Sequence, residues 1–106
     1  MYEDISPAEF VAQREADESW QLLDVREPWE IDIASLPQCV AIPLAEILSR
    51  HREINADKPV AVICHSGGRS AKVATFLAGQ GFSRVANIAG GIDAWAEEVD
   101  NSLPRY

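Results

Sequence analysis

A cysteine, two glycines and an arginine lie close together in the segment from Val60 to Ser70, VAVICHSGGRS. An apolar run typical of a buried strand ends at Cys64, and a glycine-containing turn then leads into a helix. A free thiol is only a few per cent ionised at neutral pH, because its ordinary pKa is about 8.5. A helix N-terminus, a nearby guanidinium and backbone amides that glycines turn toward the sulfur all lower that value. The segment therefore predicts a site that holds Cys64 as a reactive thiolate, with Arg69 adding fixed charge at its rim.

The whole chain has the composition of one ordinary globular domain. It has 106 residues, of which 47% are hydrophobic and 25% are charged, and this is enough for a single core. No apolar run approaches the roughly 18 residues of a membrane span. The N-terminus, Met1-Tyr-Glu-Asp, is acidic where a secretory signal is basic. We therefore expect a cytoplasmic protein without a membrane partner.

The formal net charge of −8 argues against a nucleic-acid partner, because nucleic acids bind to basic surfaces. It also gives no long-range attraction for a small anion, which local donors at the loop must capture. Two cysteines, Cys39 and Cys64, are too few for a disulfide framework. Neither belongs to a CxxC pair or to a cysteine and histidine cluster with zinc spacing, so we expect no metal and no cofactor.

Helical and strand patterns alternate along the chain. Strands are predicted at 21–25, 39–42, 59–64 and 85–88, and helices at 6–16, 44–51, 70–79 and about 91–99, with a helical turn at 30–34. The first helix begins with the capping box Ser6-Pro-Ala-Glu9. Such alternation implies an α/β fold with a mainly parallel sheet of about five strands and helices on both faces. Sites in these sheets lie at the carboxyl ends of strands, where Cys64 stands.

Two further expectations concern the packing of this single domain, 1–106. In the helix at 44–51, the spacing of Leu44, Ile47 and Leu48 predicts one buried face. The core is expected to span about 6–99, and the tail, 100–106, is expected to be loose.

Four short motifs follow one another between residues 22 and 95. They are Leu22-Leu-Asp-Val-Arg-Glu27, Ile42-Pro43-Leu44, Cys64-x-x-Gly67-x-Arg69-Ser70 and Gly90-Gly91-Ile-x-x-Trp95. In this order and spacing they resemble the rhodanese-like (single-domain sulfurtransferase) family from Ser6 to about Val99. The resemblance implies the three-layer rhodanese-like fold.

The resemblance also implies a reaction. Members of the family take sulfane sulfur from a small anionic donor such as thiosulfate, or from a protein donor, carry it as a cysteine persulfide and pass it to an acceptor, which can also be a protein. On this sequence, Cys64 is the sulfur-bearing nucleophile. The persulfide-binding loop is the six residues that follow it, namely His65, Ser66, Gly67, Gly68, Arg69 and Ser70.

Two other functions remain open. Related phosphatases and arsenate reductases have C-x5-R loops that accommodate a tetrahedral oxyanion, whereas Cys64 and Arg69 form the shorter C-x4-R. The shorter loop suits a single sulfur atom and favours sulfur transfer. The alternative of another class is a sulfur-carrier or interaction module that acts only with a protein partner.

One segment departs from the family pattern. Many rhodaneses have Gly-His-Ile-x-Gly-Ala where this chain has Ala34-Ser-Leu-Pro-Gln-Cys39. A similar sequence occurs in rhodanese modules attached to adenylyltransferases that activate ubiquitin-like sulfur carriers. This similarity hints at a biosynthetic donor role.

Polar residues around the loop each allow two interpretations. Asp24 and Arg26, at the end of the neighbouring strand, are expected to brace the loop by hydrogen bonds, with substrate contact as the alternative. For Arg69 the alternative is a structural ion pair. His65 is expected at the exposed rim rather than as a general base. The hydroxyl of Ser70, like that of Ser66, is expected to be a loop or cap group, with contact to the sulfur as the alternative.

The remaining notable side chains are expected to be structural. Cys39 is interpreted as a small core residue, with a disulfide to Cys64 as the alternative. Trp29 is expected in core or rim packing, with a partner surface as the alternative.

Overall fold

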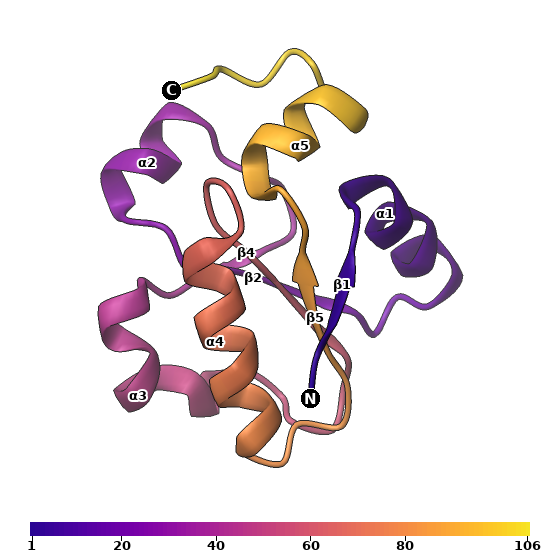
Figure 1. Cartoon of the computed structure of the whole chain (residues 1–106), viewed down its shortest axis with the longest axis vertical. Coiled ribbons are helices and arrows are strands. Elements are labelled where there is room, and N and C mark those ends of the chain that lie inside the picture. The colour runs from indigo at the N-terminus through magenta and orange to yellow at the C-terminus, as the bar shows by residue number, and fades with distance from the viewer.

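Five parallel strands form the centre of this computed structural model, which describes all 106 residues (Figure 1). The strands are β1 (Glu3–Ile5), β2 (Gln21–Asp24), β3 (Val40–Ala41), β4 (Val60–Ile63) and β5 (Val85–Ile88). They lie side by side in the order β1-β5-β4-β2-β3. The strand that leads into Cys64 is therefore the middle one, and the predicted α/β fold with a five-stranded parallel sheet is confirmed.

Helices cover both faces of the sheet. They are α1 (Pro7–Ala16), α2 (Pro28–Ile33), α3 (Ile47–Arg50), α4 (Gly68–Gly79) and α5 (Gly91–Glu98), and 3-10 turns at Leu44–Glu46 and His51–Glu53 flank α3. Phe10 of α1 and Trp95 of α5 pack on one face, whereas Ile47 of α3 and Val73 of α4 pack on the other. No helix is long and apolar enough to span a bilayer.

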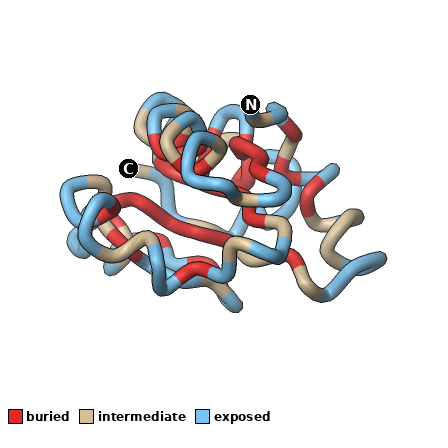
Figure 2. The backbone as a smooth tube through the Cα atoms, turned by 90° about the horizontal axis from the view of Figure 1, so that it is seen from below, coloured by how far each residue is buried: buried red, intermediate tan, exposed pale blue.

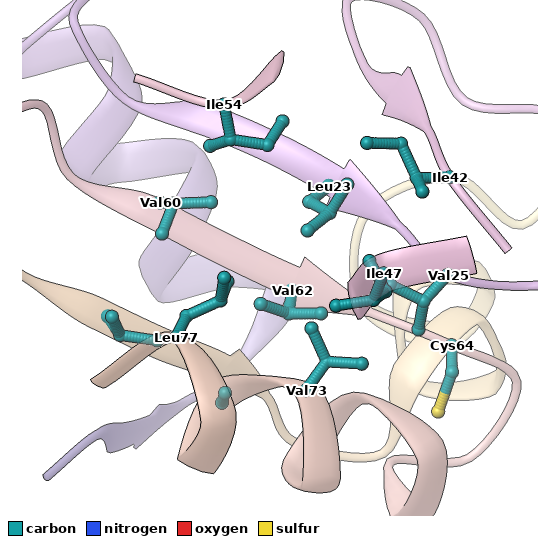
Figure 3. Close-up of a cluster of buried hydrophobic side chains, with 12 residues drawn as sticks. Leu23, Val25, Ile42, Ile47, Ile54, Val60, Val62, Cys64, Val73 and Leu77 are labelled. Atoms are coloured by element: carbon teal, nitrogen blue, oxygen red, sulfur yellow. The ribbon is translucent and has the colours of Figure 1, made fainter. Parts of the chain in front are cut away.

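The middle strand is buried on both sides, as expected for a parallel sheet between helix layers (Figure 2). Successive side chains point to opposite faces. Val60, Val62 and Cys64 join the cluster that α4 covers, whereas Ala61 and Ile63 join the other. Cys64 thus lies at the end of its cluster, beside the loop that leads into α4 (Figure 3). The strand period therefore sets the face on which the sulfur lies.

The predicted start of the first helix is confirmed. The Ser6 hydroxyl accepts a hydrogen bond from the Glu9 amide at 3.1 Å, and the Glu9 carboxylate accepts one from the Ser6 amide at 2.8 Å. This reciprocal pair is a capping box.

The region at 44–51 differs from the single helix that the sequence predicts. It consists of α3 between two 3-10 turns, and Leu48 is 76% exposed rather than buried. A 3-10 turn has about three residues per turn, so it rotates the side chains that follow out of the register expected from a period of 3.6. Ile47 keeps the buried position that was predicted.

Two helix starts and one strand also differ from the prediction. The helix after the loop begins at Gly68 rather than Ser70, and α2 begins at Pro28 rather than Glu30. The first strand, β1, was not predicted. It is a three-residue edge strand in which only Ile5 is buried, so it has no apolar pattern to detect.

Candidate functional site

Cys64 stands directly after β4, at the carboxyl edge of the sheet, and exposes 1% of its surface. Gly67 adopts a positive φ of 113°, which favours glycine, and turns the backbone so that its amide donates to the Cys64 sulfur at 3.1 Å. The Ser70 oxygen, from the first turn of α4, lies 3.3 Å from the same sulfur. The loop therefore surrounds the sulfur with polar groups, as the sequence predicts.

These contacts govern the ionisation of the thiol. Burial raises the pKa of Cys64, but the Ser70 hydroxyl and the amides of Ser70, Gly67 and Ser66 lower it by more, so the net pKa is below its ordinary value. A lowered pKa increases the fraction of nucleophilic thiolate at neutral pH. The site is therefore chemically suited to a sulfur nucleophile.

The N-terminus of α5 fixes the loop backbone from the other side. The amide of Ile92 donates to the Cys64 carbonyl at 2.9 Å, and the amide of Asp93 donates to the His65 carbonyl at 3.2 Å. Gly91 makes this approach possible. A Cβ on Gly91 would lie 2.5 Å from the His65 oxygen and would also collide with the Cys64 carbonyl. Gly91, of the motif Gly90-Gly91-Ile-x-x-Trp95, is therefore required by the close approach of α5 to the cysteine loop.

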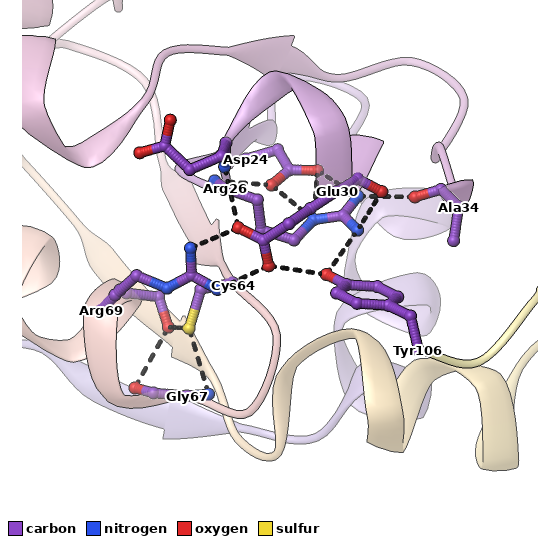
Figure 4. A network of polar contacts seen from close by, with 10 residues as sticks. Asp24, Arg26, Glu30, Ala34, Cys64, Gly67, Arg69 and Tyr106 are labelled. Carbon is purple, nitrogen blue, oxygen red and sulfur yellow. Dashed lines mark hydrogen bonds and ion pairs between the residues drawn. The ribbon is translucent and has the colours of Figure 1, made fainter. Parts of the chain in front are cut away.

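The guanidinium of Arg69 is directed at Glu30 of α2. Its two terminal nitrogens meet the two carboxylate oxygens of Glu30 at 2.5 and 2.8 Å (Figure 4). This bidentate pair holds the pKa of Glu30 at about 2, helped by the Glu27 amide and the Tyr106 hydroxyl and opposed by burial. The ion pair that the sequence left as an alternative for Arg69 is therefore present.

Asp24 and Arg26 form a second, fully buried ion pair next to the first. Arg26 donates to the Asp24 carboxylate at 2.7 Å, to the Ala34 carbonyl at 2.7 Å and to the Tyr106 hydroxyl at 3.0 Å. Neither residue hydrogen-bonds to the loop. Arg26 instead fastens the segment of α2, which contains Glu30, so any bracing of the loop passes through Glu30 and Arg69.

The C-terminal tail, for which the sequence predicts a loose segment, makes specific contacts through Tyr106. It returns to the site, where the Tyr106 hydroxyl donates to Glu30 at 2.9 Å. The Tyr106 ring stacks on the imidazole of His65, with centroids 4.2 Å apart. Ring stacking and two hydrogen bonds to buried charges join Tyr106 to the site, and composition alone does not reveal these contacts.

His65 is about one-third exposed, in keeping with the rim position expected for it. One ring nitrogen lies 3.2 Å from the Asp93 carboxylate of α5. The imidazole thus forms part of the surface over the loop. Trp29 on α2 is 61% exposed, and its ring lies edge-on to that of Tyr106 with centroids 6.0 Å apart. It therefore also belongs to this rim rather than to the core.

The disulfide considered for Cys39 and Cys64 does not fit the strand register. Val40 pairs with Leu23 of β2, and Leu23 pairs with Val62 of β4. Cys39 is therefore two strands away from Cys64 and three residues behind it, which places the Cα atoms about 14 Å apart. Disulfides need Cα atoms within about 7 Å. Both thiols are free.

Three polar residues at the site were missed by sequence reasoning, namely Glu30, Tyr106 and Asn87. Glu30 could have been found from the sequence, because Arg69 needs a negative partner and Glu30 is an acidic residue in the helix that follows β2. Asn87 is a polar residue in the buried strand β5 and hydrogen-bonds to Ser70. No group of three or more His, Cys, Asp or Glu side chains is arranged to hold a metal ion.

Known proteins share both the sequence and the fold. The family model described as Rhodanese-like domain matches residues 6–98. A sulfurtransferase from Allochromatium vinosum is 41% identical over 90 residues, which cover 84% of each chain. The Rhodanese-like/PpiC domain-containing protein 12, chloroplastic, from Arabidopsis thaliana is 48% identical over 90 residues, 81% of this chain, but the match spans only 30% of that protein.

Solved structures agree. The crystal structure of a rhodanese-related protein from Thermoplasma volcanium superimposes with a TM-score of 0.82 at 35% identity and covers 92% of this chain and 94% of its own. The sheet order, the cysteine loop and these matches lead to one assignment. The chain belongs to the rhodanese-like domain family.

Proposed function

We propose that this protein transfers sulfane sulfur through a persulfide on Cys64. The observation that carries the proposal is the buried Cys64 sulfur with the Gly67 amide at 3.1 Å and the Ser70 hydroxyl at 3.3 Å. The loop amides, among them that of Gly67, stabilise a thiolate before attack and the charge of the persulfide after it. The Ser70 hydroxyl adds to this stabilisation when its proton faces the sulfur. The sulfurtransferase name of the relative from Allochromatium vinosum supports the same chemistry.

With thiosulfate as donor, the two steps balance as follows. The Cys64 thiolate attacks the outer sulfur of thiosulfate, a new S–S bond forms, and the old S–S bond breaks with its electron pair leaving on sulfite. In the second step an acceptor thiolate or cyanide attacks the terminal persulfide sulfur. The electron pair of that S–S bond returns to Cys64 as a thiolate, so covalent capture divides one transfer into two displacements.

The loop and its ion pair argue against phosphatase or arsenate reductase activity. Such enzymes bind a tetrahedral oxyanion with free donors, whereas Arg69 is engaged by both oxygens of Glu30. A carboxylate at this position would also repel a multiply charged oxyanion.

The same ion pair supports a second candidate, a carrier loaded by a protein persulfide. Thiosulfate is a dianion, and Glu30 neutralises the one arginine of the loop. A protein persulfide brings less negative charge to the cysteine loop than thiosulfate does. A protein donor can also gain binding energy by contact with Trp29, which is 61% exposed. This candidate keeps the chemistry of Cys64 and changes only the donor.

Steady-state kinetics test the proposal and separate the donors. The protein is supplied with cyanide and with one of two donors, either thiosulfate or a second protein that carries a cysteine persulfide. The thiocyanate formed is then measured. We expect thiocyanate to form faster than by direct cyanolysis with at least one donor, and only at that background rate in Cys64→Ser. Turnover of an aryl phosphate or of arsenate, without thiocyanate from either donor, would contradict sulfur transfer.

A further inference from the structure

A chain of polar side chains runs from the edge of the sheet to the catalytic sulfur. Asp4 of β1 and Asn87 of β5 are register partners, and the Asn87 amide nitrogen donates to the Asp4 carboxylate at 2.9 Å. The Asn87 oxygen accepts from the Ser70 hydroxyl at 2.5 Å, and Ser70 lies 3.3 Å from the Cys64 sulfur. Ser70 is fully buried and Asn87 is 5% exposed, so bulk water does not compete for the contacts of Ser70 with Asn87 and Cys64.

The directions of these hydrogen bonds follow from the chemistry of the groups. An ionised carboxylate only accepts, so Asp4 requires the NH2 group of Asn87 to face it. The Asn87 oxygen must then face Ser70 and needs a donor. Ser70 has one hydroxyl proton and three acceptors within reach, namely the Asn87 oxygen at 2.5 Å, the Gly67 carbonyl at 3.2 Å and the Cys64 sulfur at 3.3 Å. The shortest contact takes the proton.

With its proton on Asn87, Ser70 presents a lone pair to the sulfur. A Cys64 thiol satisfies this arrangement, because its S–H donates to the Ser70 oxygen. A Cys64 thiolate does not, because two acceptors then face each other. To stabilise the thiolate, Ser70 must rotate its proton to the sulfur and leave the buried Asn87 oxygen without a donor, which carries a free-energy penalty.

We propose that Asn87 is a positioning residue that, held by Asp4, controls the Ser70 proton and thereby limits the thiolate fraction of Cys64. The resting cysteine is kept partly protonated and so less open to oxidation, whereas Gly67 supports the anion when it forms. This proposal deepens the proposed function, on which it rests for its consequence in sulfur transfer. Its test measures the ionisation of Cys64 and needs no sulfur transfer.

Other charges also influence Cys64 and are left unchanged in the test. Around the cysteine they are Arg69 of α4, Glu30 of α2, the Asp24–Arg26 pair after β2, His65 of the loop, Asp93 of α5 and the tail residue Tyr106. β1 carries Asp4 and also Glu3, whose carboxylate pairs with Arg84 at 2.8 Å. A comparison of two Asp4 variants therefore separates the charge of this residue from its orienting effect.

The test is the pH dependence of iodoacetamide alkylation, assigned to Cys64 by peptide mapping. Ser70→Ala should raise the midpoint, because the thiolate then lacks the hydroxyl that can rotate to donate to it. Asn87→Leu should lower it by about half to one pH unit, because the Ser70 proton becomes free to face the sulfur. In the double variant the Asn87→Leu effect should vanish. A midpoint in Asn87→Leu at or above wild type, or an equal shift without Ser70, would overturn the proposal.

Variants of the exposed Asp4 keep the test decisive if Asn87→Leu does not fold. Asp4→Asn retains an acceptor for the Asn87 amide, whereas Asp4→Ala frees that amide to turn over and donate to Ser70. The midpoint should therefore be lower in Asp4→Ala than in Asp4→Asn, although both lack the charge. Equal midpoints would reject the orienting role, even where sulfur transfer itself is intact.

Discussion

Arg69 of the cysteine loop and Glu30 of α2 form a bidentate ion pair, with nitrogen to oxygen distances of 2.5 and 2.8 Å. Thirty-nine residues separate them in the sequence. The pair joins the loop to α2, and Tyr106 joins the same carboxylate to the C-terminal tail at 2.9 Å. The charge of the loop arginine is thus already balanced before any donor arrives.

Glu30→Gln should improve the use of thiosulfate, because it removes the negative charge beside the cysteine loop and leaves the positive charge of Arg69 unbalanced. We expect the KM for thiosulfate to fall by about threefold to tenfold, with the effect shrinking at high salt. Asp32→Asn is the matched control, since it removes one charge from the exposed side of the same helix. An equal change in both variants would mean that overall charge, and not the ion pair, governs the donor.

The same carboxylate should make stability depend on pH. The pKa of Glu30 is depressed to about 2 in the folded protein from an ordinary value of 4.5. A depressed pKa stabilises the fold above the unfolded value, and this contribution is lost as pH falls from about 4.5 toward 2. Urea unfolding of wild type and Glu30→Gln should show a gap on the order of 1–2 kcal/mol at pH 6, allowing for the partial exposure of Arg69. The gap should close near pH 2. A gap that stays constant over this range would contradict the ion-pair explanation.

Gly91→Ala should disturb the cysteine loop, because its Cβ would collide with the carbonyls of Cys64 and His65. The positive φ of 57° adds strain for any side chain. We expect a loss of Cys64 reactivity of at least about tenfold, or a fold destabilised by several kcal/mol. Gly79→Ala is the control, since nothing lies within 4 Å of its Cβ position. Wild-type reactivity and stability in Gly91→Ala would show that α5 does not constrain the loop.

Tyr106→Phe should separate the two contacts of the tail. The variant keeps the stacking on His65 and loses the hydroxyl that bonds to Arg26 and Glu30. We expect destabilisation of about 1 kcal/mol in urea unfolding, and a larger loss in Tyr106→Ala. If both variants unfold like wild type, the tail does not contribute to stability, and this result would support the expectation of a loose segment.

The sequence predicted the parts of this molecule that repeat or that follow local rules. The alternation of apolar runs revealed β2, β4 and β5, and the Ser6 capping box placed the start of α1. The spacing from Cys64 to Ser70 predicted a loop with polar groups around the Cys64 sulfur. Each of these features depends on residues that are close in the chain.

The parts that could not be predicted depend on contacts between distant residues. The partner of Arg69 comes from α2, and Tyr106 reaches it from the other end of the chain. A regular helix over 44–51 would bury Leu48, but the preceding 3-10 turn directs its side chain into solvent. Asn87 is a polar residue in the buried strand β5, and only its neighbours Asp4 and Ser70 explain it.

Intact-mass spectrometry after exposure to a sulfur donor tests the central claim most directly. Wild type, Cys39→Ser and Cys64→Ser are each incubated with thiosulfate or with a protein persulfide, desalted and weighed. A persulfide on Cys64 predicts a gain of one sulfur atom, about 32 Da, in wild type and Cys39→Ser, and its removal by cyanide. No gain with either donor, or an equal gain in Cys64→Ser, would contradict sulfur transfer through Cys64.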